Sequence, residues 1–315
     1  MNTLLNFSHI SNNELLMSSI FSFSGGPQGV KSVSLFRMRF QILLTKIYNE
    51  ALLEGQSKEE TMKYEGFDLS GKSAIVTGAG TGIGKAIAVG LAQAGAEVAL
   101  IGRRLEPLQE TEKEVTANGV KALLLQGDIA KLDFQSQAVS QTLERFGKID
   151  VLVNNAAVLF KGPIEETTEE EWDTTMNINL KGNFFFALAV GREMIKQKKG
   201  KIINILSNCS FVAEHGIGTY CVSKGGLLMT TRCLATEWGP YGIQVNAIGP
   251  AFVRTPMNDP VLADPHFVEW STNRIPLHRM GQPEEMVGAA IYLASDASSF
   301  VNGAVLMVDG GFTAC

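Results

Sequence analysis

The sequence is poor in the residues from which disulfides and metal sites are built. Its four histidines form no cluster with metal-ligand spacing, and no C-x-x-C pair is present. The four cysteines are Cys209, Cys221, Cys233 and Cys315. We therefore expect reduced thiols, a cytoplasmic location and no metal ion.

Basic clusters and long uncharged apolar runs are missing as well. The net charge is -5, and the lysines and arginines are not gathered as binding to nucleic-acid phosphates requires. No apolar run is long enough, without charge, to predict a membrane span. These absences argue against nucleic acid and membrane as partners. The 315 residues, of which 45% are hydrophobic, suffice for one large α/β domain.

Residues 1–61 differ in composition from the rest of the chain. Among the first 49 residues only Glu14 is acidic, and four are basic: Lys31, Arg37, Arg39 and Lys46. That pattern permits a mitochondrial transit peptide or another targeting or partner-binding segment. We favour a different hypothesis, in which residues 1–61 are a disordered extension or are translated from a misassigned start in a bacterial gene. Met62 then opens a single domain, residues 62–315.

From Lys72 onward, short apolar segments alternate with helical patterns. The segments expected to be strands are 73–76, 97–101, 121–126, 149–153, 201–206, 243–248 and 305–308. Strands separated by helices are typical of parallel sheets. The sequence therefore predicts an α/β fold, a single Rossmann-like doubly wound parallel sheet of about seven strands with helices on both faces.

A glycine-rich turn joins the first predicted strand to its helix. Glycines let the backbone approach a pyrophosphate, and the helix N-terminus that follows favours negative charge. The spacing is not G-x-G-x-x-G, so the turn alone is only suggestive. The residues expected to bind a dinucleotide here are Gly78, Thr81, Gly82, Ile83 and Gly84.

The ends of the next strands carry further candidates. Arg103 and Arg104 follow the second strand, where an arginine accommodates a 2′-phosphate, so we expect NADP, with NAD possible. The alternative is two solvated surface arginines. Asp128 is placed either to bind an adenine amino group or to cap the next helix. The Asn155–Ala156 turn is placed to line a cofactor cleft, or is an ordinary polar turn.

Tyr220 and Lys224 are four residues apart, so a helix places them on one face. A neighbouring ammonium favours the phenolate, and we expect it to lower the pKa of Tyr220 toward the range of a general acid or base. Ser207 follows a buried strand at the sheet edge where such folds present their chemistry. Asn179 falls inside a helix predicted over 168–196, which suggests a kink or a functional side chain. By itself the Tyr220-x-x-x-Lys224 pair also fits an ordinary solvated helix face.

Together these motifs resemble the short-chain dehydrogenase/reductase family from about residue 66 to 315. The motifs are, in order, Thr77-Gly-x-x-x-Gly-x-Gly84, Asp128, Asn154–Ala156, Asn179, Ser207, Tyr220-x-x-x-Lys224, Asn246–Thr255 and Val308–Gly311. The resemblance implies an enzyme that exchanges hydride between NAD(P) and a secondary alcohol or ketone. It also implies a homotetramer.

The resemblance assigns a role to each motif. Tyr220 is implied as general acid/base, Ser207 as the group that hydrogen-bonds the substrate oxygen, and Lys224 as the holder of the nicotinamide ribose. Asn179 is implied to position a water that links Lys224 to solvent. The implied cofactor contacts are Asp128, Ile129, Asn155, Ala156, Tyr220, Lys224, Pro250, Val253 and Thr255.

The C-terminal motifs are Phe267-x-x-Trp270, Arg274-x-Pro276, Arg279-x-Gly281-x-Pro283 and Phe300-Val-Asn-Gly303. They resemble the gluconate 5-dehydrogenase group of sugar-acid dehydrogenases, which implies a small sugar acid or polyol as substrate. The same pattern also occurs in 3-oxoacyl-carrier-protein reductases, and a non-catalytic NADP-binding sensor is the alternative of another class. Residues 256–281 are proline-rich and aperiodic, which predicts a mobile lid over the substrate. A sugar-acid carboxylate needs a cation near the cavity, and the candidates for it are Arg254, Arg274, Arg279 and His215.

Overall fold

The computed structural model describes Lys46 and residues 65–314. The hypotheses for residues 1–61 lie outside these residues, apart from Lys46. Residues 65–314 belong to one unit, Tyr64–Cys315. In this described part of the chain, no helix combines the length and the apolar character that crossing a membrane requires.

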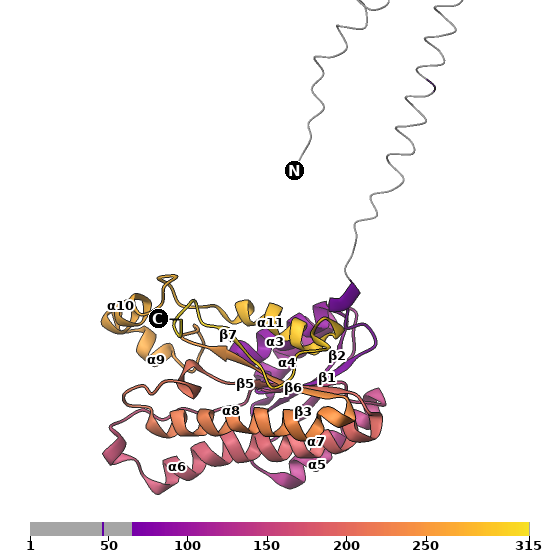
Figure 1. Cartoon of the computed structure of the whole chain (residues 1–315), viewed down its shortest axis with the longest axis horizontal. Coiled ribbons are helices and arrows are strands. Elements are labelled where there is room, and N and C mark those ends of the chain that lie inside the picture. Colours follow the sequence, from indigo (N-terminus) through magenta and orange to yellow (C-terminus); the bar gives the residue numbers. More distant parts are fainter. Residues whose placement is uncertain (1–45, 47–64, 315) are drawn as a thin grey trace, which may run out of the picture. The chain divides into compact units, whose positions relative to one another are not determined.

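A seven-stranded, fully parallel sheet forms the centre of the described unit (Figure 1). The strands are β1 (Ser73–Thr77), β2 (Glu97–Gly102), β3 (Ala122–Gln126), β4 (Val151–Asn154), β5 (Gly200–Ile205), β6 (Ile243–Pro250) and β7 (Val305–Val308). Their order is β3-β2-β1-β4-β5-β6-β7, which confirms the predicted doubly wound sheet. The order reverses between β1 and β4, and such a switch point opens a crevice at the carboxyl ends of the strands.

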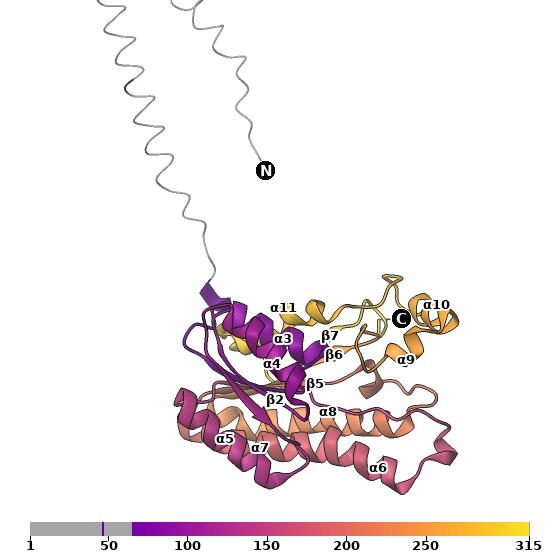
Figure 2. The same cartoon turned by 180° about the vertical axis from the view of Figure 1, so that it is seen from behind.

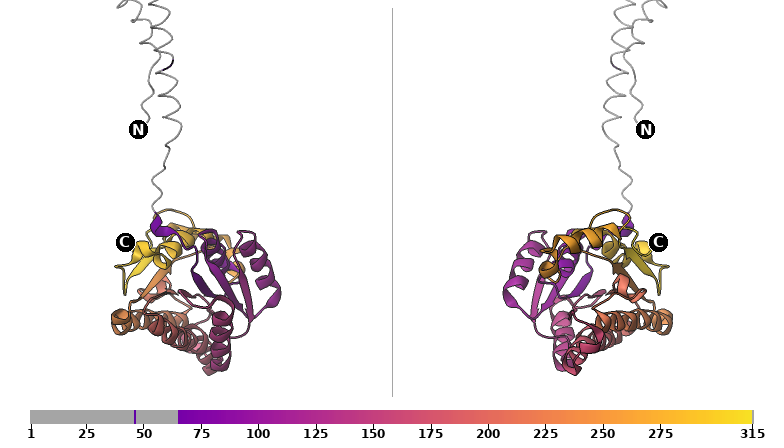
Figure 3. Two further views of the ribbon diagram at one scale, coloured as in Figure 1. Left: turned by 90° about the vertical axis from the view of Figure 1, so that its right-hand side faces the viewer. Right: turned by 90° about the vertical axis from the view of Figure 1, so that its left-hand side faces the viewer.

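Helices cover both faces of the sheet (Figures 1 and 2). One layer contains α3 (Gly82–Gln93), α4 (Leu105–Thr116) and α11 (Val287–Ala294), and the other α5 (Leu132–Phe146), α6 (Glu169–Met176), α7 (Asn183–Gln197) and α8 (Gly218–Trp238). The end-on views of Figure 3 separate the two layers. The short helices α9 (Asp259–Leu262) and α10 (Pro265–Asn273) lie beyond the carboxyl ends of the strands.

The strands are apolar on both sides because each face packs against helices. Along β1, Ala74 and Val76 join the core under α3 and α11, whereas Ile75 joins the core under α5 and α7. All three side chains are fully buried. This double burial explains why the strands read as continuous apolar runs in the sequence and not as alternating ones.

The helix predicted over 168–196 is interrupted where Asn179 stands. Thr168 caps α6 in a capping box with Glu171, and residues Asn177–Gly182 are π-helical before α7 continues to Gln197. A π-helical turn inside an α-helix is the kind of interruption that the buried asparagine suggested.

Candidate active site

A cavity of about 950 Å³ lies at the carboxyl ends of the strands, around the switch point. Gly84 and Asn179 are the two predicted site residues that do not line it. The predicted residues that do are Gly78, Thr81, Gly82, Ile83, Arg103, Arg104, Asp128, Ile129, Asn155, Ala156, Ser207, Tyr220, Lys224, Pro250, Val253 and Thr255. The fold thus gathers around one cavity residues that are spread along the chain from Gly78 to Thr255.

The glycine turn after β1 is tied to the end of β4. Asn155 donates from Nδ2 to the carbonyl of Thr77 at 2.8 Å, and the amides of Asn155 and Ala156 donate to Thr77 Oγ1 at 2.9 and 3.0 Å. Gly78 has a φ of 66° and leaves no room for a Cβ, which would lie 2.7 Å from Asn155 Nδ2. A Cβ on Gly84 would collide with the carbonyl oxygen of Gly78 and with Asn155 Nδ2. Gly84 therefore supports the turn from behind the cavity.

The N-terminus of α3 opens onto the cavity. Thr81 is its N-cap and makes no side-chain hydrogen bond to the helix, so the first helical amides are left for a ligand. Gly82 and Ile83 line the cavity there, and Thr255 stands against Gly82 from the loop after β6. Aligned amides at a helix N-terminus attract phosphate, so this turn suits the pyrophosphate of a dinucleotide.

The two predicted arginines line the cavity just after β2. Arg103 and Arg104 follow β2 and are exposed, and neither forms an ion pair with another described residue. Asp128 accepts a hydrogen bond from the Ala130 amide at 2.9 Å. Because α5 begins only at Leu132, Asp128 closes a turn and does not cap the helix.

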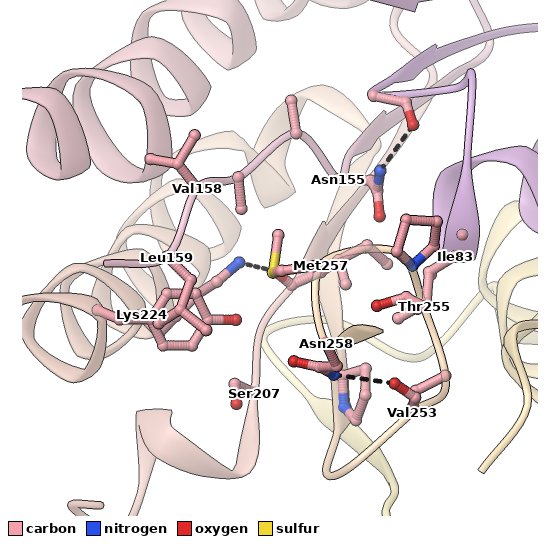
Figure 4. Close-up of a pocket in the computed structure, with 18 of the residues that line it drawn as sticks. Ile83, Asn155, Val158, Leu159, Ser207, Lys224, Val253, Thr255, Met257 and Asn258 are labelled. Carbon is pink, nitrogen blue, oxygen red and sulfur yellow. Dashed lines mark hydrogen bonds between the residues drawn. The ribbon is translucent and has the colours of Figure 1, made fainter. Parts of the chain in front are cut away.

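The residues with proton chemistry meet on the other side of the cavity, facing Ile83 and Thr255 (Figure 4). Ser207, which follows β5, donates from Oγ to Asn208 Oδ1 at 2.8 Å. Lys224 is 2% exposed and donates from Nζ to the carbonyl of Ile205 at 2.6 Å. Its Nζ lies 5.6 Å from the ring centroid of Tyr220, which comes one turn earlier on α8.

Burial controls the charges of these groups. It lowers the pKa of Lys224 to about 8, against an ordinary value of 10.5. Burial also raises the pKa of Tyr220, the Cys209 thiol acts in the same direction, and the Ser207 hydroxyl opposes them. The lowering of the Tyr220 pKa that we expected from Lys224 is thus not found. The reason is that the low-polarity cavity disfavours both charged forms, the phenolate and the ammonium.

Asn179 holds the π-helical segment against its neighbours. Its Oδ1 accepts from the Val158 amide at 2.8 Å, and its Nδ2 donates to the Val158 carbonyl at 2.8 Å and to Ser223 Oγ at 3.1 Å. Ser223 in turn donates to the carbonyl of Tyr220 at 2.7 Å. Both amide hydrogens of the asparagine are therefore used to join the segment to α8 and to the chain after β4.

The segment predicted to be a lid forms α9 and α10 and lines the cavity with Met257, Asn258, Val261, Phe267 and Trp270. Asn258 Nδ2 donates to the Val253 carbonyl at 3.0 Å, as Figure 4 shows. Phe252, in the loop after β6, has ring contacts with Phe267 at 5.9 Å and Trp270 at 5.7 Å between centroids. These contacts hold α10 against the loop after β6 and give this part of the cavity an apolar wall.

Three of the four candidate cations for a substrate carboxylate do not line the main cavity. Arg254 lines a separate cavity, Arg274 stacks over Trp270 at 5.0 Å, and Arg279 forms a bidentate ion pair with Glu285. Of the four candidates, only His215 lines the main cavity.

Sequence reasoning missed several polar residues of the cavity, among them Lys161, Asn208 and Glu214. Lys161 Nζ lies 5.5 Å from the ring centroid of Phe267, which also lines the cavity. Burial lowers the pKa of Lys161 and the Glu214 carboxylate raises it, so the two side chains act on each other. The available signal was position: Lys161 follows the asparagine turn after β4, and Asn208 directly follows Ser207.

Comparisons with known proteins agree with this geometry. The family model described as "Enoyl-(Acyl carrier protein) reductase" matches residues 78–313. Gluconate 5-dehydrogenase of Gluconobacter oxydans is 44% identical over 247 residues, which are 78% of this chain and 96% of that protein. 2-Dehydro-3-deoxy-D-gluconate 5-dehydrogenase of Dickeya dadantii is 40% identical over 249 residues, 79% of this chain and 98% of that protein.

Solved structures agree as well. The crystal structure of a gluconate 5-dehydrogenase from Burkholderia cenocepacia in complex with NADP and tartrate is 39% identical, with a TM-score of 0.77. The match covers 80% of this chain and 98% of that one. With the sheet order, the glycine turn and the serine, tyrosine and lysine in place, these matches show that the chain belongs to the short-chain dehydrogenase/reductase family of enzymes.

Proposed function

We propose that the protein is an NADP-dependent oxidoreductase that interconverts a secondary alcohol and a ketone on a small sugar acid. One observation carries the proposal: a single cavity joins a phosphate-binding glycine turn to the hydroxyl groups of Ser207 and Tyr220, with Lys161 at its substrate end. The relatives named gluconate 5-dehydrogenase and 2-dehydro-3-deoxy-D-gluconate 5-dehydrogenase support this substrate class.

The residues present suit NADP. Gly78 and Gly82 have positive φ values and Gly78 has no room for a Cβ, which suits a backbone close to a pyrophosphate, and the free amides of α3 face the same space. Arg103 and Arg104 are free of ion pairs with the described residues and would hold a 2′-phosphate. When bound, the cofactor supplies or accepts the hydride.

Tyr220 would move the proton. Because burial keeps the pKa of the phenol above its ordinary value, the group is protonated at neutral pH and is ready to protonate a ketone oxygen during reduction. Oxidation of an alcohol needs the phenolate, so it is expected to speed up as the pH rises. Ser207 would hydrogen-bond the same oxygen and stabilise its developing charge, and Lys224 would hold the ribose. Asn179, through its contacts with Ser223 and Val158, would keep α8 in place.

Lys161 takes the place of the arginines as the cation for a substrate carboxylate. It lines the cavity at the end formed by Phe267, and His215 lines the same space. An ammonium against a carboxylate gives a charge-assisted contact that a neutral polyol cannot make. The proposed substrate orientation therefore places the carboxylate near Lys161 and the reacting carbon near Tyr220.

The test is a panel of gluconate, 5-ketogluconate, neutral polyols and 3-oxoacyl thioesters, each with NADP(H) and NAD(H). Turnover of the sugar acids with NADP(H) supports the proposal, and selective turnover of the thioesters moves the protein to fatty-acid reduction. Tyr220→Phe should keep NADPH binding and lose turnover by about 10² to 10⁴ fold. If the variant keeps full turnover, Tyr220 is not the general acid/base. If neither the wild type nor the variant turns over any substrate, the hypothesis of a non-catalytic NADP-binding sensor gains support.

We also propose that the enzyme is a cytoplasmic homotetramer. Large apolar side chains are exposed on the outer helices, namely Phe185 on α7 and Val222 and Met229 on α8, and Leu306 is exposed on the edge strand β7. A second copy of the chain would cover these positions. Light scattering of the purified protein checks the tetramer, and N-terminal sequencing of the native protein decides between a start at Met62 and an earlier one.

A further inference from the structure

A chain of two hydrogen bonds runs from Ser207 through Asn208 to Glu214. Ser207 Oγ donates to Asn208 Oδ1 at 2.8 Å, and Asn208 Nδ2 donates to Glu214 Oε1 at 2.6 Å. Asn208 is 3% exposed and Ser207 7%, so the bond between them is shielded from water, whereas the bond to the half-buried Glu214 is only partly shielded. Glu214 reaches the pair from the loop before α8 and also lines the cavity.

The carboxylate decides the direction of this chain. An ionised carboxylate accepts hydrogen bonds and cannot donate, so the NH₂ group of Asn208 must face Glu214. The amide oxygen of Asn208 must then face Ser207, and the Ser207 hydroxyl has to donate to it. The amide of Cys209 donates to the same Oγ at 3.2 Å. The Ser207 side chain is thus held by one donor and one acceptor before any substrate arrives.

We propose that Asn208 and Glu214 are positioning residues for Ser207: Glu214 orients the amide of Asn208, and Asn208 holds the Ser207 side chain in the rotamer from which its one hydroxyl proton turns to the substrate oxygen when that oxygen binds. Neither side chain takes part in the family motifs described above. The proposal rests on the proposed function only in requiring that Ser207 contacts the reacting oxygen. Figure 4 places Ser207 on the cavity wall that also carries Lys224.

Glu214 has a second effect through its charge. The groups that act on the Tyr220 phenol are Cys209, Ser207, Cys221 and Glu214, and Lys224 lies beside its ring. The negative charge of the Glu214 carboxylate contributes to the raised pKa of Tyr220. The same charge attracts the ammonium of Lys161 and acts to raise the pKa of that group. Removing this negative charge should therefore lower the pKa of Tyr220 and move the pH profile of alcohol oxidation to lower pH.

The experiment compares Asn208→Ala and Glu214→Gln with Glu144→Gln, which removes an exposed carboxylate on α5 away from the cavity. For Asn208→Ala we expect kcat to fall about tenfold with an unchanged KM for NADP, the effect of losing one orienting hydrogen bond. For Glu214→Gln we expect a smaller loss and a pH profile shifted to lower pH. Glu144→Gln should match the wild type in both kcat and the pH profile.

Two results overturn the proposal. One is an Asn208→Ala variant with wild-type kcat; the other is a Glu214→Gln profile that coincides with that of Glu144→Gln. Glu214 is only half-buried, so its variant remains informative if Asn208→Ala does not fold. The ratio of variant to wild type can be measured with whichever alcohol of the panel the enzyme oxidises. A failure of gluconate as substrate is therefore distinguishable from a failure of the positioning role.

Discussion

Replacing Lys201 with methionine should stabilise the protein at neutral pH. Lys201 lies on β5, far from the cavity, and is 4% exposed. Its Nζ donates to Ser298 Oγ at 3.0 Å and forms no ion pair with a described residue. Burial lowers its pKa from 10.5 to about 8, Asp296 opposes this, and Lys199 and Lys72 act with burial. The folded chain therefore holds an ammonium in a place that disfavours it.

The sign follows from proton binding. Between pH 8 and 10.5 the unfolded chain binds more protons at Lys201 than the folded chain, so this residue makes stability rise with pH in that window. Below pH 8 Lys201 is protonated in both the folded and the unfolded chain, so the full free-energy cost of burying its ammonium remains. A pKa lowered by this amount corresponds to at most about 3 kcal/mol, at about 1.4 kcal/mol per tenfold change in proton affinity. Loss of the hydrogen bond to Ser298 costs about 1 kcal/mol of this gain. We therefore expect Lys201→Met to raise the free energy of unfolding by about 2 kcal/mol at pH 7.

Ser298 should tolerate the change, because its hydroxyl donates to the carbonyls of Leu293 and Ser295 at 3.1 Å. Urea unfolding followed by circular dichroism at pH 7, 8.5 and 10 measures the effect. The gain over wild type should shrink steadily as the pH rises. The control is Lys113→Met, at an exposed position on α4. A destabilised Lys201→Met protein at pH 7, or a gain that does not change with pH, would refute the reasoning.

Three further predictions concern the cavity. Lys161→Met should raise the KM for gluconate about tenfold and leave that for a neutral polyol unchanged, since only the acid contacts the ammonium; steady-state kinetics check this. Replacing both Arg103 and Arg104 with alanine should weaken NADPH binding at least tenfold and leave NADH binding unchanged, as measured by fluorescence titration; equal losses for both cofactors would contradict the assignment. Gly84→Ala should lower the free energy of unfolding by about 2 kcal/mol and weaken both cofactors, because its Cβ meets the Gly78 carbonyl, and a normal denaturation curve would argue against that contact.

Local patterns in the sequence predicted the strands and most of the cavity wall. The apolar runs predicted all seven strands to within one or two residues, because both faces of this sheet are buried. The glycine turn and the Tyr220–Lys224 spacing were recognisable because neighbours in sequence are neighbours in the structure there. The lid segment was harder to read: α9 and α10 are short, and Phe252 holds α10 from a different part of the chain.

The charges of the site could not be read from spacing. Lys224 is where the sequence placed it, yet burial overrides its effect on the pKa of Tyr220. Of the arginines expected to recognise the substrate, Arg274 packs on Trp270 and Arg279 pairs with Glu285, whereas Lys161 lines the cavity. Each of these outcomes depends on contacts between residues distant in the chain and on how much water the fold leaves around them.

The sequence by itself determined the alternation of strands and helices, the glycine turn and the order of the reacting residues, because these depend on periodicity, backbone freedom and short-range spacing. Only the tertiary structure decided which polar groups share the cavity and how they are charged. The Ser207–Asn208–Glu214 chain exists because the loop before α8 folds back on the end of β5. Packing of this kind brings donors and acceptors together and removes water from them, and that is what sets their direction and protonation.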